Sequence, residues 1–224
     1  HTGYNLTSIF DMSFSTNGDA SLQQLIQRIT SKQVVVGVYG LGYVGLPLAL
    51  RFADVGLKVI GFDIDQTKVK QLNANESYIE RIAPQTIRRA RDHGFEATSD
   101  FARSKEVDAL IICVPTPLDA HREPDLSFIT TTLDAALPNM RPGQLVSLES
   151  TTWPGTTDEI VAPRLAAYGY FPGDNCALVF SPEREDPGNT QYGTKDIPKV
   201  IGGSTKQCLE MGIALYQHAI QTMV

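Results

Sequence analysis

Hydrophobic residues recur along the chain as short continuous runs that alternate with stretches of helical periodicity. Short apolar runs rich in β-branched residues are typical of strands buried on both faces of a parallel sheet. We expect such strands at 34–39, 58–62, 95–98, 108–114, 145–149, 177–180 and 199–203. Segments with a helical pattern lie between them, at 44–55, 65–73, 76–92, 99–105, 125–137, 156–168 and from 204 to the end. This alternation predicts an α/β fold with a doubly wound parallel sheet and right-handed crossovers.

The first 33 residues are an N-terminal extension to this pattern. Residues 1–20 are mixed and polar, and they predict no element. From Ser21 onward, apolar positions follow i, i+3, i+4 and i+7, which is one face of a short helix; Asp19 or Ser21 is suited to cap it. We expect the helix to pack over the domain formed by residues 34–224, with an oligomer contact as the alternative.

Composition and charge narrow the functional classes. The 224 residues carry a net charge of −6, so there is no basic footprint for nucleic acid or for an anionic membrane surface. No apolar stretch reaches the ~18 residues that span a bilayer, and the N-terminus lacks the features of a signal peptide. The sequence therefore predicts a cytoplasmic protein with no nucleic-acid or membrane partner.

Cysteines and histidines give no sign of a metal site. The three cysteines are scattered without a C-x-x-C, and the four histidines are isolated, whereas zinc ligands usually occur at close spacing. We therefore expect no metal, and reduced thiols. Cys113 lies within an apolar strand as inert core, and Cys208 has only Lys206 as an activating neighbour, which argues against a nucleophilic role.

A glycine-rich motif follows the first strand directly. Gly40, Gly42 and Gly45 form G-x-G-x-x-G between that strand and a helix, and Asp63 ends the second strand 18 residues later. In this pattern the glycines allow a tight turn, close approach of a pyrophosphate and close helix packing, while the acidic side chain accepts from ribose hydroxyls. The motif indicates a Rossmann-like domain that prefers NAD to NADP, because a carboxylate repels a 2′-phosphate. The alternative is a glycine-rich turn without a ligand.

Other strands also end in small polar or rigid residues. These endings are 115–117 (PTP), 150–152 (STT) and 181–184 (SPER). Ligands of open α/β sheets bind outside the carboxyl ends of the strands, so the endings predict a surface for a ligand larger than NAD alone. Glu183 is the candidate general base if burial raises its pKa; the alternative is a structural salt bridge with Arg184.

Taken together, five segments carry a family resemblance. They are 40–47 (GLGYVGLP), 61–65 (GFDID), 114–117 (VPTP), 149–152 (ESTT) and 180–184 (FSPER). Over residues 34–224 the chain resembles the UDP-glucose/GDP-mannose dehydrogenases, the nucleotide-sugar 6-dehydrogenase family. The run 181–189 (SPEREDPGN) looks like the branch that acts on UDP-N-acetylhexosamines, notably UDP-N-acetylglucosamine.

The resemblance implies oxidation of the sugar C6 alcohol to a carboxylate by two hydride transfers to two NAD⁺, through a cysteine-bound thiohemiacetal and thioester. It implies base catalysis and thioester hydrolysis by Glu183, with Arg184 and Glu185 beside the UDP-sugar, and a homo-oligomeric parent. From the motif and the resemblance together, the candidate cofactor-binding residues are Gly40, Gly42, Tyr43, Val44, Gly45, Asp63, Lys68, Pro115, Thr116, Ser150 and Thr151.

One departure from the family limits this expectation. The family's catalytic cysteine lies in a glycine-rich motif far downstream, and a UDP-binding domain accompanies it; neither is in these 224 residues. We therefore expect an N-terminal NAD-binding portion that is inactive alone.

Several alternatives stay open. The parent enzyme can instead be a UDP-glucose or UDP-N-acetylmannosamine 6-dehydrogenase, or a dehydrogenase of the 3-hydroxyacid or 6-phosphogluconate type. A non-catalytic NAD-sensing module is the alternative outside enzymes. The length of the parent reading frame distinguishes the enzyme from the sensor.

Overall fold

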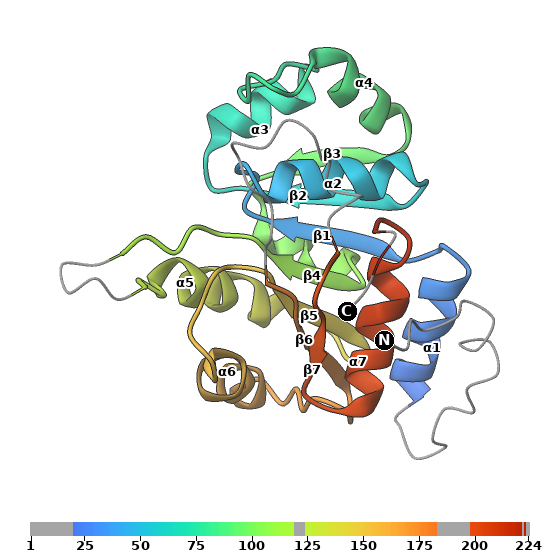
Figure 1. The fold of residues 1–224 in the computed structure, drawn as a ribbon, viewed down its shortest axis with the longest axis vertical. Coiled ribbons are helices and arrows are strands. Elements are labelled where there is room, and N and C mark those ends of the chain that lie inside the picture. Colours follow the sequence, from blue (N-terminus) through green and yellow to red (C-terminus); the bar gives the residue numbers. More distant parts are fainter. Residues whose placement is uncertain (1–19, 119–123, 183–197, 221, 223–224) are drawn as a thin grey trace.

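The fold is built on one seven-stranded sheet with the strand order β3-β2-β1-β4-β5-β6-β7 (Figure 1). The computed structural model describes residues 20–118, 124–182, 198–220 and 222. The strands are β1 (Val35–Tyr39), β2 (Lys58–Phe62), β3 (Phe95–Thr98), β4 (Ala109–Ile112), β5 (Gln144–Leu148), β6 (Cys176–Phe180) and β7 (Gly202–Gly203). The chain runs outward from β1 to β3 and then from β4 to β6 on the other side, so the order reverses between β1 and β4.

The sheet is parallel from β3 to β6, as the sequence predicts, but its last strand differs. β7 pairs with β6 in antiparallel register, with Val179 opposite Gly203 and Phe180 opposite Gly202. The prediction of a parallel strand over 199–203 was therefore wrong. β7 lies at the edge of the sheet and pairs with β6 alone. Sheets that are otherwise parallel often carry an antiparallel strand at this position.

The helices follow the predicted order. They are α1 (Ala20–Thr30), α2 (Gly45–Asp54), α3 (Gln66–Asn73), α4 (Pro84–Asp92), α5 (Ser127–Ala136), α6 (Ala162–Ala167) and α7 (Lys206–Tyr216). Shorter helical turns are η1 (Phe101–Glu106), η2 (Leu137–Asn139) and η3 (Thr157–Val161).

Three local expectations about the helices were wrong. The helical segment expected at 99–105 is the short turn η1, which begins only at Phe101 and is capped by the Asp100 carboxylate accepting from Ala102 N. The predicted helix over 76–92 begins only at Pro84. The last helix ends at Tyr216 and does not reach the C-terminus.

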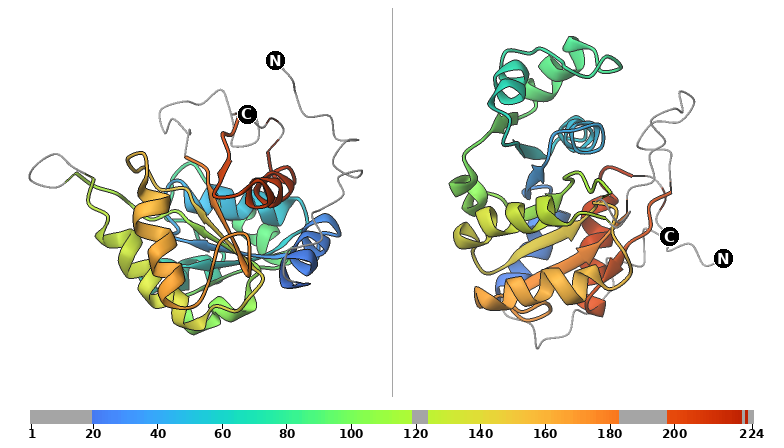
Figure 2. Two further views of the ribbon diagram at one scale, coloured as in Figure 1. Left: turned by 90° about the horizontal axis from the view of Figure 1, so that it is seen from below. Right: turned by 90° about the vertical axis from the view of Figure 1, so that its left-hand side faces the viewer.

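Helices cover both faces of the sheet and create two apolar cores (Figure 2). On one face, α1, α2, α4 and α7 pack on strand residues such as Val36 and Val38. On the other face, α5, η2 and α6 pack on residues such as Tyr39 and Ile112. Alternate residues of one buried strand therefore serve opposite cores, which explains why the strands are continuous apolar runs.

Helix α1 is attached to the first core by apolar and polar contacts. Its buried residues are Leu22, Leu25, Ile26 and Ile29, the positions that the helical pattern singles out. Arg28 donates to the buried Asp108 carboxylate from Nε (3.0 Å) and Nη2 (2.8 Å). His218, just past α7, has Nε2 2.8 Å from the Ile29 carbonyl oxygen. The contact of His218 therefore joins the two ends of the described chain, and that of Arg28 ties α1 to the start of β4.

The attachment of α1 predicts a pH dependence of stability. Burial lowers the pKa of His218, and the nearby Lys32 charge acts in the same direction. The unfolded chain then binds this proton more readily, so the free energy of unfolding falls as pH drops below the unfolded value of about 6.5 and on through the lower folded pKa. His218→Gln should remove this contribution, so that its free energy of unfolding falls less steeply with acid than that of wild type.

Urea unfolding at a series of pH values measures the slope. His93→Gln, which removes an exposed imidazole at the end of α4, is the control variant. An unchanged acid slope in His218→Gln contradicts the assignment.

Candidate functional site

A cleft of about 1240 Å³ lies where the strand order reverses, at the carboxyl ends of the parallel strands. Segments that follow β1, β2, β4 and β5 form its floor, and α5 contributes one wall. This is the position at which open α/β sheets bind ligands. The predicted residues that line the cleft are Gly40, Gly42, Tyr43, Val44, Asp63, Lys68, Pro115, Thr116, Ser150 and Thr151.

Each of the three glycine positions of the loop requires glycine for a different structural reason. Gly40 has φ of 93°, and a Cβ there would lie 2.8 Å from the Cys113 carbonyl oxygen. A Cβ on Gly45 would lie 1.9 Å from the Gly40 carbonyl oxygen, so Gly45 sits beneath the cleft as the contact between α2 and the loop. At Gly42 no described atom lies within 4 Å of the Cβ position. Gly40 and Gly45 therefore serve the fold, and Gly42 leaves space in the cleft.

Asp63 is tied to the same loop. Its Oδ2 accepts from Leu41 N and its Oδ1 accepts from Asp65 N, both at 2.9 Å, and Lys68 Nζ lies 3.7 Å from Oδ2. The residue is only 7% exposed. A carboxylate has about four acceptor positions, so it can still accept from a ligand while it orients the loop.

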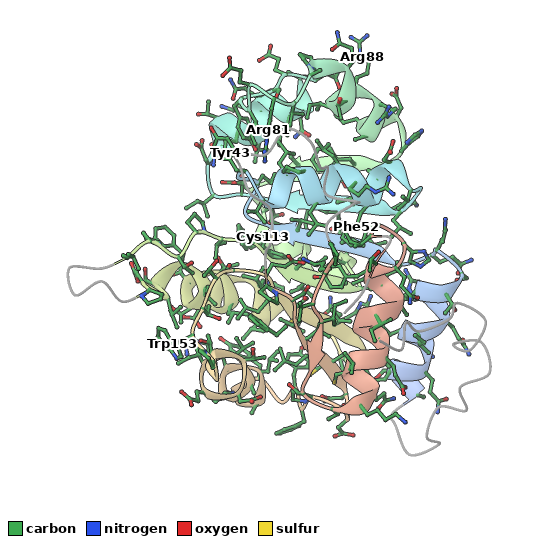
Figure 3. The ribbon with its side chains drawn as sticks, viewed as in Figure 1. Tyr43, Phe52, Arg81, Arg88, Cys113 and Trp153 are labelled. Carbon is green, nitrogen blue, oxygen red and sulfur yellow. The ribbon has the colours of Figure 1, made fainter. Side chains whose placement is uncertain are left out.

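Two residues that are not among the predicted site residues hold the glycine-rich loop from outside. The Tyr78 hydroxyl donates to the Leu41 carbonyl oxygen, and Arg81 Nη2 donates to the Tyr43 carbonyl oxygen at 3.1 Å (Figure 3). In a trans peptide the next N–H points opposite to the carbonyl. The N–H groups of Gly42 and Val44 are therefore turned away from Tyr78 and Arg81.

The rims after β4 and β5 are joined to each other. Ser150 Oγ donates to the Val114 carbonyl oxygen at 2.7 Å, and Ser150 N donates to the Ile112 carbonyl oxygen at 3.2 Å. Thr116 and Thr151 flank this junction and line the cleft. The Thr152 hydroxyl is buried and has no hydrogen-bond partner among the described residues; sequence reasoning included Thr152 in a motif but not among the site residues.

A buried ion pair lies at the end of β5. Lys199 Nζ is 2.6 Å from Glu149 Oε2; Glu149 is 0% exposed and Lys199 7%, and Glu149 borders the cleft. Glu149 belongs to the motif 149–152 and Lys199 to the predicted strand 199–203, and the sequence gives no sign that the two meet. No local pattern indicates a contact across 50 residues.

The remaining candidate residues are placed as follows. Glu183, Arg184 and Glu185 lie outside the described residues. The three cysteines are buried, and burial raises the pKa of Cys176 to about 12. Within the described ranges, no three His, Cys, Asp or Glu side chains gather as a metal site, and no described helix is long and apolar enough to cross a membrane.

Comparison with known proteins decides which family this cleft belongs to. The model of the UDP-glucose/GDP-mannose dehydrogenase family, NAD binding domain, matches residues 34–220. The chain belongs to this family. NAD is the cofactor of the matching domain, and the match favours this family over dehydrogenases of the hydroxyacid type.

Individual relatives match this chain over about the same range of residues as the family model does. Protein CapL of Staphylococcus aureus is 36% identical over 186 residues, with 83% of this chain and 43% of CapL covered. UDP-N-acetyl-D-glucosamine 6-dehydrogenase of Salmonella typhi is 33% identical, with 84% and 44% covered. The solved UDP-N-acetyl-mannosamine dehydrogenase Cap5O of S. aureus superposes with a TM-score of 0.79 at 32% identity, over 85% of this chain and 47% of Cap5O. The chain therefore spans less than half the length of these relatives.

Because Gly42 and Gly45 have different environments, substitution by alanine should affect cofactor affinity at Gly42 and stability at Gly45. Gly42→Ala should change the free energy of unfolding by less than about 1 kcal/mol and lower NAD⁺ affinity at least about tenfold, because the methyl group enters the cleft. Gly45→Ala should destabilise the fold by more than about 3 kcal/mol, since its clash is with backbone.

Chemical denaturation and calorimetric titration with NAD⁺ measure the two effects. Each alanine variant is the control for the other, because the substitution is identical. Full NAD⁺ affinity in Gly42→Ala contradicts the assignment of the loop.

Proposed function

We propose that this chain is the NAD-binding half of a nucleotide-sugar dehydrogenase that oxidises the C6 alcohol of a UDP-N-acetylhexosamine, foremost UDP-N-acetylglucosamine, to the uronic acid with two NAD⁺. The observation that carries the proposal is the cleft itself. The glycine-rich loop, the Asp63 carboxylate and the hydroxyl-bearing rims after β4 and β5 line one continuous space.

In this proposal the cofactor extends along the strand ends. The pyrophosphate lies against the N–H groups at the start of α2, and the adenosine ribose lies at Asp63 and Lys68 on the β2 side. The nicotinamide half then extends to the β4 and β5 side, with Thr116, Ser150 and Thr151 available as donors and acceptors. The other candidate contacts are Gly40, Gly42, Tyr43, Val44, Gly45 and Pro115.

Localisation, partners and oligomeric state of the whole protein are also proposed. The three cysteines are buried and form no disulfide, which supports a cytoplasmic location. The net negative charge supports the absence of nucleic-acid and membrane partners. A homo-oligomeric parent is proposed from the family resemblance. A non-catalytic NAD sensor is the second candidate, because the cofactor cleft alone would serve such a module.

The Asp63 geometry predicts selectivity for NAD⁺ over NADP⁺. A carboxylate next to the ribose repels a 2′-phosphate, so wild type should bind NAD⁺ much more tightly. Asp63→Ala should reduce the ratio of the NADP⁺ to the NAD⁺ dissociation constant by about tenfold or more. It should also weaken NAD⁺ binding, because Leu41 N and Asp65 N lose their acceptor.

Calorimetric titration with both cofactors tests this selectivity. Asp54→Asn, which removes a carboxylate at the end of α2 outside the cleft, controls for the change in net charge. Equal affinities of wild type for NAD⁺ and NADP⁺ would refute the role of Asp63.

The choice of sugar is predicted for the whole enzyme. The run 181–189 (SPEREDPGN) resembles enzymes of UDP-N-acetylhexosamines, and Arg184 has five fixed donors suited to an acetamido carbonyl or a neighbouring carboxylate. A site built to hydrogen-bond a group rejects a substrate that lacks it, by up to ~10⁴-fold. The relatives include enzymes named for UDP-N-acetylglucosamine and for UDP-N-acetylmannosamine.

We therefore expect a higher kcat/KM for UDP-N-acetylglucosamine than for UDP-glucose. Steady-state assays of NADH formation with UDP-glucose, UDP-N-acetylglucosamine and UDP-N-acetylmannosamine measure this order. Higher turnover of UDP-glucose would overturn the N-acetyl assignment, whereas a preference for the manno sugar would correct only the epimer.

A further inference from the structure

The ion pair of Glu149 and Lys199 is a buried charge pair that the proposed function does not use. Glu149 follows β5, and Lys199 comes from the segment that leads to β7, 50 residues later in the chain. The Tyr216 ring of α7 lies 5.2 Å from Lys199 Nζ, and the Tyr216 hydroxyl lies 2.8 Å from Ser147 Oγ. Three separate parts of the chain therefore meet at this pair.

The stability of the fold does not explain why both charges are buried here. Removing two charges from water costs several kcal/mol for each ion, and an apolar pair of similar volume is often as stable or more stable. The carboxylate also acts on its surroundings, because burial and the Glu149 charge together raise the pKa of Tyr216. This arrangement suggests a role for the charges themselves.

The position of the pair indicates what that role is. Glu149 borders the cleft, next to Ser150 and Thr151, on the β4 and β5 side where the proposed function puts the nicotinamide. Oxidised and reduced NAD share every group except that ring, which carries a positive charge only when oxidised. A charge below the ring therefore acts on one redox form and not on the other.

We propose that the Glu149–Lys199 pair sets the relative affinity of the cleft for NAD⁺ and NADH, with Lys199 balancing the Glu149 carboxylate beneath the nicotinamide. This inference rests on the proposed function, since it requires NAD in the cleft. A balanced pair lets the oxidised cofactor bind and the reduced cofactor leave. An unbalanced carboxylate would hold NAD⁺ more tightly, and an unbalanced ammonium would repel it.

The proposal makes predictions of opposite sign for the two single variants. Lys199→Met leaves a negative charge, so the ratio of the dissociation constants, NAD⁺ over NADH, should fall roughly tenfold. Glu149→Gln leaves a positive charge, so the same ratio should rise by a similar factor. The double variant Glu149→Gln, Lys199→Met has no charge at the pair and should return to the wild-type ratio.

Both cofactors are titrated into the full 224-residue chain. NAD⁺ binding is followed by calorimetry, and NADH binding by energy transfer from Trp153, the single tryptophan, which is 40% exposed (Figure 3). Lys206→Met is the matched control, because it removes an amine from the exposed pair with Glu210. Its ratio should equal that of wild type.

The pH of each titration is chosen so that the remaining charge is present. A buried carboxylate without its partner is protonated more readily and a buried amine less readily, so Lys199→Met is also measured on the alkaline side and Glu149→Gln on the acid side. Among the residues that the structure describes, the titratable groups that interact with one another beside the pair include Tyr216 of α7 and Cys113, which follows β4. Their effect is removed by comparison with the double variant at the same pH.

The outcomes separate the inference from the proposed function. Shifts of opposite sign in the single variants, restored in the double variant, support the inference. A ratio that stays constant while both cofactors bind, or that moves in the same direction in both single variants, overturns it and leaves a purely structural pair. Failure of wild type to bind either cofactor instead overturns the proposed function. If one single variant does not fold, the other single variant and the double variant still test the inference, because the change in the ratio of dissociation constants is predicted separately for each.

Discussion

The contact of Gly45 with the Gly40 carbonyl is the constraint on which the cleft depends. Any side chain at Gly45 would collide with backbone, so the start of α2 can approach the end of β1 only through glycine. That approach fixes the glycine-rich loop above the point where the strand order reverses. The neighbouring elements then need only hold the loop, because its course is already determined.

Three side chains hold the glycine-rich loop through hydrogen bonds to its peptide groups. Asp63 accepts from Leu41 N, while Tyr78 and Arg81 donate to the carbonyl oxygens of Leu41 and Tyr43. Since both carbonyls are occupied, the adjoining N–H groups keep one orientation without a ligand. An anion that binds there meets donors that need little rearrangement, which reduces the entropic cost of binding. Preorganisation of this half of the cleft is therefore a property of the fold.

The sequence predicted what is locally encoded and missed what is not. The apolar runs and the glycine spacing depend on neighbouring residues, so the strands, the motif and most helices could be placed. The contacts of Tyr78 with Leu41 and of Lys199 with Glu149 span 37 and 50 residues. Tyr78 lies in an irregular segment, where no periodicity identifies the inward-facing side chain. The direction of β7 was missed for a related reason: two glycines carry no side-chain pattern.

The two halves of the cleft are consequently stabilised by different physics. On the β2 side, the side chains of Asp63, Tyr78 and Arg81 hold a loop whose shape glycine already determines. On the β5 side, Ser150 joins the rims through the Val114 carbonyl, and the adjacent Glu149 joins them to the segment before β7 through a buried charge. The β5 side therefore contains a buried charge pair whose balance a single substitution can change without altering the glycine-rich loop. The proposed function puts the nicotinamide, whose charge changes on reduction, in that half of the cleft, and we propose that the two ions are buried there for this reason.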